Sequence, residues 1–264
     1  MRKILPTIPE GLGSPFYYGS LSSLALFFSV PTSDVELGAN SNLFDPVEIS
    51  NIAIAAVSFQ RYFADFGDNA VIVNELELST VVVPKTSAKD FSTVALDEFV
   101  RGEEQSLTLG HLPVAVACDA KPAVDAGIGL FGEPKFLATM SSQAPSPNDG
   151  SGDRSWMVSY SRDGKDSDFT VKCELPSVHP TLVNSGIVTT YGCVEGNPIG
   201  SRWAIYQAAL LHFPISQQDS VSFDVHDTDP TVSSFLNSVR NGSIVAAREC
   251  RTPPVAARGR PYSV

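Results

Sequence analysis

Lys135 is the residue whose type and surroundings best suit covalent chemistry. It stands in the stretch GIGLFGEPKFLATM (residues 127–140), behind a proline and in front of an apolar run. If Phe131, Phe136 and Met140 enclose its side chain, lost hydration lowers the lysine pKa and a neutral, nucleophilic amine becomes available near pH 7. Such an amine condenses with a ketone or aldehyde. The resulting iminium stabilises the carbanion left by decarboxylation or by removal of a neighbouring proton.

The alternative is a lysine on the protein surface. Successive side chains of a β-strand point to opposite faces, so a core-facing Phe136 places Lys135 in solvent. The local pattern alone favours this surface position.

The segment from Gly127 to Leu137 resembles the segment of acetoacetate decarboxylases in which a glycine is followed, after an intervening stretch, by an aromatic residue and then by Pro-Lys-Lys-Leu. The corresponding run here is Gly-Glu-Pro-Lys-Phe-Leu (residues 132–137), so the resemblance puts the family's Schiff-base lysine at Lys135. The family also has Phe-Glu followed fifteen positions later by a second glutamate, and the matching positions are Gln60 and Glu75. The similarity is clearest over residues 12–160, which include SPFYYGSLSSLALFFSVPTS near the N-terminus.

The resemblance implies roles for the matching residues. Lys135 is the nucleophile and Glu75 shuttles or positions protons. Gln60, where the family has a glutamate, is a neutral hydrogen-bond partner. Phe131, Phe136 and Met140 are expected to bind substrate and to desolvate the lysine, because the family's second lysine is replaced by phenylalanine.

The family's arginine before the first strand has no counterpart, because its position falls around Ser20 to Ser22. Arg61 follows Gln60 and on a strand points to the opposite face, so it is a poor substitute. Arg202 beside Trp203 is the better candidate.

Two classes of function follow. The first is a carbon–carbon lyase that forms an iminium with a keto acid or related ketone, acting as a decarboxylase or as an aldolase or dehydratase. The second is a non-catalytic barrel that binds a small molecule and has lost the family chemistry. We expect an enzyme, because Lys135 is retained in an otherwise apolar run.

The rest of the sequence predicts a mainly β (α+β) protein with a single domain over residues 1–264. β-Branched and apolar runs bounded by Gly, Pro, Asp or Ser are typical of strands. The predicted strands are residues 21–30, 51–66, 70–84, 111–118, 127–132, 155–161 and 168–175. The resemblance implies an antiparallel, cone-like β-barrel with a few peripheral helices, and such closure removes exposed strand edges.

Helices are expected in two segments. The first lies within residues 86–105, with Ser87 or Ser92 as N-cap and an end near Gly102, and the second runs from about Asp229 to Asn241. Residues 141–155 have the composition of a loop, and their place just after Lys135 makes them a candidate lid. The basic, Pro-rich residues 251–264 are expected to be irregular.

Composition limits the partners. With 29 acidic and 18 basic residues the formal net charge is −11, which disfavours nucleic acids and anionic membranes. No apolar run has the length of a membrane span and no signal peptide is evident, so we expect a cytoplasmic protein. The four cysteines and four histidines show no metal-ligand spacing, so we expect free thiols, no metal and no cofactor. The resemblance implies a homo-oligomer.

Overall fold

The computed structural model of the chain describes residues 5–67, 70–86, 94–103, 108–145, 154–175, 180–215, 220–250, 255–258 and 262–263. Within them, twelve strands form one large sheet. These strands are β1 (Leu12–Val30), β2 (Phe44–Pro46), β3 (Glu48–Ile49), β4 (Ile52–Gly67), β5 (Ala70–Pro84), β6 (Gly110–Cys118), β7 (Lys135–Leu137), β11 (Thr181–Val194), β12 (Asn197–His212), β14 (Ser243–Cys250), β15 (Val255–Arg258) and β16 (Tyr262–Ser263). The mainly β class predicted from the sequence is confirmed.

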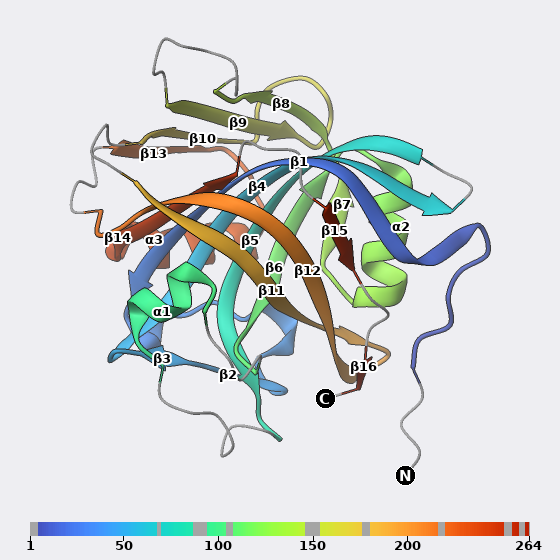
Figure 1. The fold of residues 1–264 in the computed structure, drawn as a ribbon, viewed down its shortest axis with the longest axis horizontal. Helices are drawn as coiled ribbons and strands as arrows, with labels where there is room; N and C mark the ends of the chain where they lie inside the picture. The colour runs from blue at the N-terminus through green and yellow to red at the C-terminus, as the bar shows by residue number, and fades with distance from the viewer. Residues whose placement is uncertain are drawn as a thin grey trace.

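The large sheet curves back over itself. Strands β4 and β5 form a long antiparallel hairpin, β1 pairs with β4 on one side and with β14 on the other, and β6 pairs with β5. Strands β11 and β12 cross in front of β4, β5 and β6 (Figure 1). Side chains of β1, β4 and β5 therefore face those of β11 and β12 across a common interior. Closure into a cone-like barrel stays a prediction.

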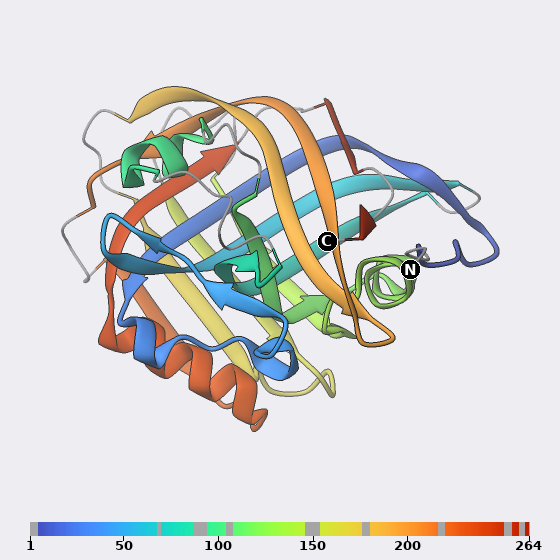
Figure 2. The same cartoon turned by 90° about the horizontal axis from the view of Figure 1, so that it is seen from below.

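A second, four-stranded sheet packs against one end of the large sheet with helix α3 (Pro230–Asn241) nearby (Figure 2). Its strands are β8 (Thr139–Gln143), β9 (Ser155–Ser161), β10 (Phe169–Glu174) and β13 (Val221–Val225). Trp156 of β9 lies between the sheets, 6.2 Å from Phe59 between ring centroids, and donates its indole N–H to Glu249 at 3.3 Å. Glu249 also lies 3.2 Å from Nε2 of the buried His212. The interface between the sheets thus combines apolar packing with a buried polar cluster.

Helix α2 (Lys121–Phe131) replaces a strand that the sequence predicted at residues 127–132. Proline near its start suits the first helical turn, and Gly132, with φ +60°, ends it. The buried residues of α2 recur at helical spacing: Ala123, Val124, Ala126, Gly127, Leu130 and Phe131. Six residues are too few to reveal that 3.6-residue period, which is why the strand prediction was wrong.

The other helix predictions are confirmed with changes at their ends. Helix α1 (Leu96–Arg101) ends at Gly102 as expected, but its N-cap is Ala95. Ser87 and Ser92, the predicted caps, lie outside the described residues. Helix α3 begins after Asp229, whose side chain accepts a hydrogen bond from the Thr231 N–H at 2.9 Å.

Two predictions of irregular structure were partly wrong. Of the predicted loop 141–155, residues 141–143 belong to β8 and Ser155 begins β9. Residues 146–153 lie outside the described residues, so the lid stays a prediction. The C-terminal segment 251–264 contains β15 and β16, which both pair with β12.

The described cysteines, Cys118, Cys173, Cys193 and Cys250, are all free, and only Cys193 is not buried. No helix in the described ranges is long and apolar enough to cross a membrane. Across the same ranges, no group of three or more His, Cys, Asp or Glu side chains is placed to hold a metal ion.

Candidate active site

Lys135 is carried into the interior by the turn that ends helix α2. Gly132 has φ +60°, and a Cβ atom there would collide with the backbone of Cys193, so both the conformation and the space require glycine. Pro134 then leads into β7, which pairs in parallel with β6 so that Lys135 lies beside Val116. The Lys135 side chain is only 4% exposed. The surface position favoured by the local pattern is therefore wrong.

Two buried carboxylates surround the Lys135 ammonium. Its Nζ atom lies 2.9 Å from Oε2 of Glu75 and 3.1 Å from Oε2 of Glu133, and each glutamate side chain is 2% exposed. The same Oε2 atom of Glu75 accepts a hydrogen bond from the Tyr62 hydroxyl at 2.9 Å. The lysine, the predicted proton carrier Glu75 and two unpredicted groups thus form one compact cluster.

These carboxylates reverse the predicted pKa shift of Lys135. Burial lowers the pKa, as the sequence analysis expected, but Glu133 and Glu75 outweigh it and raise the pKa above its ordinary value. The prediction of a neutral amine activated by desolvation is wrong, because it omitted Glu133. Burial, followed by the charge of Glu75, also raises the pKa of the Cys118 thiol to about 12, so this neighbour is neutral.

The aromatic and apolar residues predicted around the lysine are dispersed. Phe136 faces the other side of β7, 5.5 Å from the Tyr160 ring and beneath the Arg162 guanidinium at 3.6 Å. Met140 packs against the core beneath the small sheet. Phe131 packs in α2 against Phe16, with ring centroids 6.0 Å apart. The structure therefore brings Lys135 and Glu75 together and places Phe136 and Met140 elsewhere.

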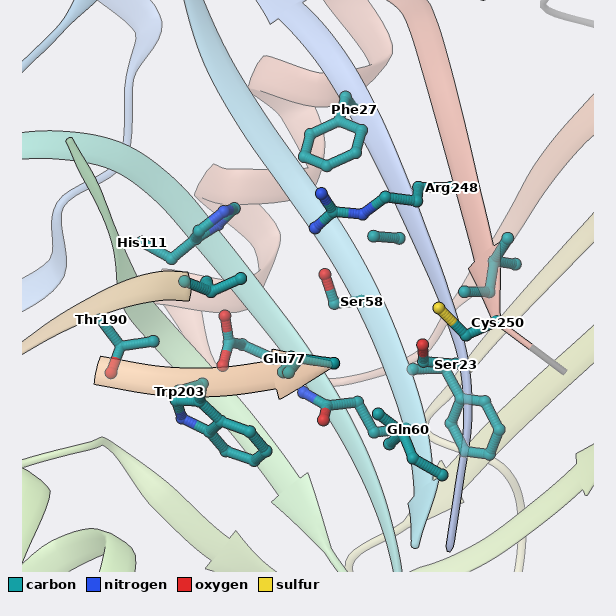
Figure 3. A pocket seen from close by; sticks show the side chains of 16 residues that line it. Ser23, Phe27, Ser58, Gln60, Glu77, His111, Thr190, Trp203, Arg248 and Cys250 are labelled. Carbon is teal, nitrogen blue, oxygen red and sulfur yellow. The ribbon is translucent and has the colours of Figure 1, made fainter. Parts of the chain in front are cut away.

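A cavity of about 80 Å³ lies between the two walls of the large sheet. Figure 3 shows its polar side chains directed into a shared space. The cavity is lined by Leu21, Ser23, Leu24, Ala25, Phe27, Ser58, Phe59, Gln60, Glu77, His111, Val188, Thr190, Trp203, Ile205, Arg248 and Cys250. Gln60, a predicted substrate-binding residue, is among them and lies in register with Glu75 on the adjacent strand.

One row of register partners connects the lysine cluster with the cavity. Residues in register on adjacent strands share a face of the sheet. From β7 to β14 the row contains Lys135, Val116, Glu77, Ser58, Ala25 and Arg248. Its last four members line the cavity, whereas Lys135 lies two strands beyond the described lining.

Arg248 is the cavity's arginine, and the sequence analysis missed it. Arg61 points outward as predicted, and Arg202, the proposed substitute, is exposed as well. Arg248 comes instead from β14, where it is the charged residue between Ala247 and Glu249 in the strand SIVAAREC. The available signal was an arginine at the end of the apolar run SIVAA, comparable to the lysine beside an apolar run at Lys135. Only the register of β14 with β1 assigns it to the cavity.

Burial lowers the pKa of both basic groups of the cavity, but only one of them loses its charge at pH 7. It lowers the pKa of His111 to about 4, with a smaller contribution from the Arg248 charge, so His111 is neutral at pH 7. Burial also lowers the pKa of Arg248, but a guanidinium remains charged. At neutral pH the positive charge of the described cavity lining therefore resides on Arg248.

No protein-family profile matches this chain, and no curated protein matches it in sequence. Solved structures do match it in fold. The enzyme MppR of enduracididine biosynthesis, complexed with pyruvate, has a TM-score of 0.59 and 9% identity, covering 99% of this chain and 93% of its own.

Two acetoacetate decarboxylase structures match as well. That of Legionella pneumophila has a TM-score of 0.58 and 9% identity, covering 100% of this chain and 93% of its own. A further acetoacetate decarboxylase has a TM-score of 0.57 and 14% identity, covering 100% and 95%. The chain therefore has the acetoacetate decarboxylase fold over its whole length, and at this level the resemblance drawn from the sequence is confirmed.

Proposed function

We propose that this protein is a lyase in which Lys135 forms a Schiff base with a small keto acid or ketone. The observation that carries the proposal is the burial of Lys135 with Nζ 2.9 Å from Glu75, within reach of direct proton transfer. The cone-like enclosure of this site belongs to the proposal. Among the proteins of this fold, MppR has been solved with pyruvate and with the condensation product of pyruvate and imidazole 4-carboxaldehyde.

The first step is removal of a proton from the resting ammonium. Glu75 accepts this proton, and the Nζ lone pair then attacks the carbonyl carbon of the ligand. The carbonyl oxygen takes up two protons, one from the attacking nitrogen and one returned by Glu75, and leaves the carbinolamine as water, so that a protonated iminium remains. Tyr62 donates to Glu75 and so fixes the carboxylate that moves the proton.

The iminium then accepts the electron pair of a breaking bond. In a decarboxylase the pair comes from the bond to the leaving carbon dioxide, and in a retro-aldol reaction it comes from a carbon–carbon bond whose other half leaves as an aldehyde. Gln60 lies in register with Glu75 and provides a neutral amide for the ligand's carbonyl or hydroxyl oxygen. For the reaction, the carbonyl carbon of the ligand must reach Nζ of Lys135, which now contacts Glu75.

A second candidate is a protein that binds a small molecule without reacting with it. The specific observation in its favour is that the described cavity lining includes Gln60 and Glu77 but does not reach Lys135. The raised pKa of Lys135 points the same way, because an ammonium is not a nucleophile.

Reductive trapping distinguishes the two candidates. The protein is incubated between pH 7 and 10 with pyruvate, acetoacetate and simple aldehydes, reduced with borohydride, and mapped by peptide mass spectrometry. We expect one adduct on Lys135. It disappears in Lys135→Arg, which keeps the positive charge beside both glutamates, and persists in Lys121→Arg, which removes an exposed lysine. Absence of any adduct on Lys135 across this pH range would leave the binding protein as the better conclusion.

The bond that breaks is assigned by two assays on the wild-type enzyme. Release of carbon dioxide from β-keto acids indicates a decarboxylase. Condensation of pyruvate with aldehydes, without carbon dioxide release, indicates an aldolase or dehydratase.

A further inference from the structure

Arg248 places a positive charge in the cavity wall, where its side chain is half-buried. The guanidinium lies 5.7 Å from the centre of the Phe27 ring, and within the described part of the chain it has no ion pair and no hydrogen bond to a side chain. A half-buried charge that faces a cavity without an ion pair is unfavourable, and a guanidinium offers five N–H donors in a planar fork. This arrangement is unfavourable for an empty protein and favourable for one that receives an anion.

We propose that the cavity is a binding site for a small organic acid, whose carboxylate is held by the Arg248 guanidinium. A carboxylate accepts two parallel hydrogen bonds from such a fork, which makes this the strongest simple pairing available to a buried arginine. The inference goes beyond the proposed function, because it concerns the cavity and holds whether or not Lys135 reacts.

The other polar groups of the cavity define the rest of the ligand. Ser58 and Glu77 follow Arg248 along the row of register partners, and Gln60 lies two residues from Ser58 on the same face of β4. The Ser58 hydroxyl and the Gln60 amide each both donate and accept hydrogen bonds. The matching ligand therefore carries a hydroxyl or amino group a few bonds from its carboxylate.

The size of the cavity limits the ligand further. About 80 Å³ holds roughly five to eight water-sized groups, at 10–15 Å³ for each. The ligand class is thus a hydroxy or amino acid of three to five carbon atoms.

A second, smaller cavity also has Arg248 in its lining. It shares Phe27, His111, Val188 and Arg248 with the first cavity, and it extends past Gly102 at the end of α1. Its lining includes Ile187, which is 39% exposed. Arg248 therefore stands where the linings of the two cavities meet.

The test is calorimetric titration at low ionic strength with lactate, glycerate and 3-hydroxybutyrate. Propionate lacks the hydroxyl group and lactamide lacks the charge, so these two serve as ligand controls. We expect at least one hydroxy acid to bind the wild-type protein, propionate to bind more weakly, and lactamide not to bind. In Arg248→Met we expect the affinity for the hydroxy acid to fall about tenfold or more, because a charge-assisted bidentate pair is lost.

Three further variants complete the design. Arg248→Lys retains the charge without the fork and should keep part of the affinity. Arg61→Met removes an exposed arginine from the outer face of β4 and should bind normally. Lys121→Arg changes an exposed lysine outside the cavity lining and should also bind normally. Because a hydroxy acid has no carbonyl group and forms no Schiff base, its binding separates a failure of this inference from a failure of Schiff-base chemistry.

Thermal unfolding without ligand distinguishes a binding role of Arg248 from a structural one. If Arg248 stabilised the empty protein, its replacement would lower the unfolding temperature. If Arg248 waits for an anion, Arg248→Met removes a half-buried charge that has no ion pair, and the unfolding temperature stays equal or rises. The inference is overturned if no hydroxy acid binds, if lactamide binds as well as lactate, if Arg248→Met keeps its affinity, or if that variant unfolds at a lower temperature.

Discussion

Two cations on the same row of the sheet, the buried Lys135 and the half-buried Arg248, differ in how their charge is compensated. Lys135, at one end, has two carboxylates within 3.1 Å, and a tyrosine hydroxyl fixes one of them. Arg248, at the other end, faces a cavity, and no described carboxylate forms an ion pair with it, although Glu77 lines the same cavity. The comparison indicates that the charge of Lys135 is compensated before a ligand arrives, whereas the charge of Arg248 is compensated only when an anionic ligand is bound.

Removing each charge separately should produce the largest contrast. Lys135→Met leaves Glu75 and Glu133 buried beside each other without a cation, so we expect a loss of about 3–5 kcal/mol in the free energy of unfolding. Arg248→Met should cause no loss in the free energy of unfolding. Urea denaturation of both variants measures the difference. Similar losses for the two would show that both charges are compensated alike and would break the comparison.

The two glutamates around Lys135 can be separated by trapping rates. Glu133→Gln removes one of the charges that raise the lysine pKa, so the neutral fraction at pH 7 should increase about tenfold for each pKa unit recovered. Glu75→Gln removes a similar charge but also the proposed proton acceptor. We expect faster borohydride trapping in Glu133→Gln and slower trapping in Glu75→Gln. Acceleration in both variants would mean that Glu75 acts only as a charge.

The pH dependence of trapping follows from the direction of the Lys135 shift. Because the pKa lies above its ordinary value of 10.5, the neutral amine should become about tenfold more abundant for each unit between pH 7 and 10. The initial trapping rate should follow this slope without a plateau. A plateau near pH 8 would indicate a lowered pKa and contradict the proposed charge compensation.

The free energy of unfolding should depend on pH in the direction set by the raised pKa of Lys135. A group whose pKa is raised on folding stabilises the protein fully below its unfolded pKa, and this contribution disappears as the pH rises through the folded value. The stability difference between the wild type and Lys135→Met should therefore persist up to about pH 10 and shrink above it.

A pair of glycine variants gives the smallest effect. A Cβ atom on Gly127 would lie 2.8 Å from Cδ of Lys135 and 2.9 Å from Oε2 of Glu133, whereas one on Gly129 meets nothing nearer than 3.5 Å. Alanine stabilises a helix by up to about 1 kcal/mol relative to glycine. Gly129→Ala should realise this gain, and Gly127→Ala should lose about 1–3 kcal/mol through crowding against the lysine. Equal unfolding temperatures for the two variants would show that the lysine cluster is loosely packed.

The strands were predictable because their apolar runs are long and end at turn residues, as in β4 and β5. The segment 127–132 was not, because its helical period appears only when the preceding residues from Lys121 are included. Single-domain organisation, oligomeric assembly and cytoplasmic location stay predictions.

The candidate site was predictable only in part. The lysine and Glu75 followed from their resemblance to a known motif, but the state of the lysine depends on Glu133, two residues earlier, which no motif marked. Arg248 lies 113 positions from Lys135, and its relation to the cavity follows from strand register across β14, β1, β4 and β5. Propensity and spacing cannot supply such a register.

The positions of the two tryptophans give the molecule separate optical reporters. Trp203 lies in the cavity wall, stacked on Tyr18 at 4.8 Å, whereas Trp156 lies between the two sheets with its indole N–H on Glu249. The sequence contains no other tryptophan. With Trp156 replaced by phenylalanine, intrinsic fluorescence would report occupation of the cavity alone. With Trp203 replaced instead, the emission would follow separation of the sheets, so filling and unfolding could be timed independently in one protein without a dye.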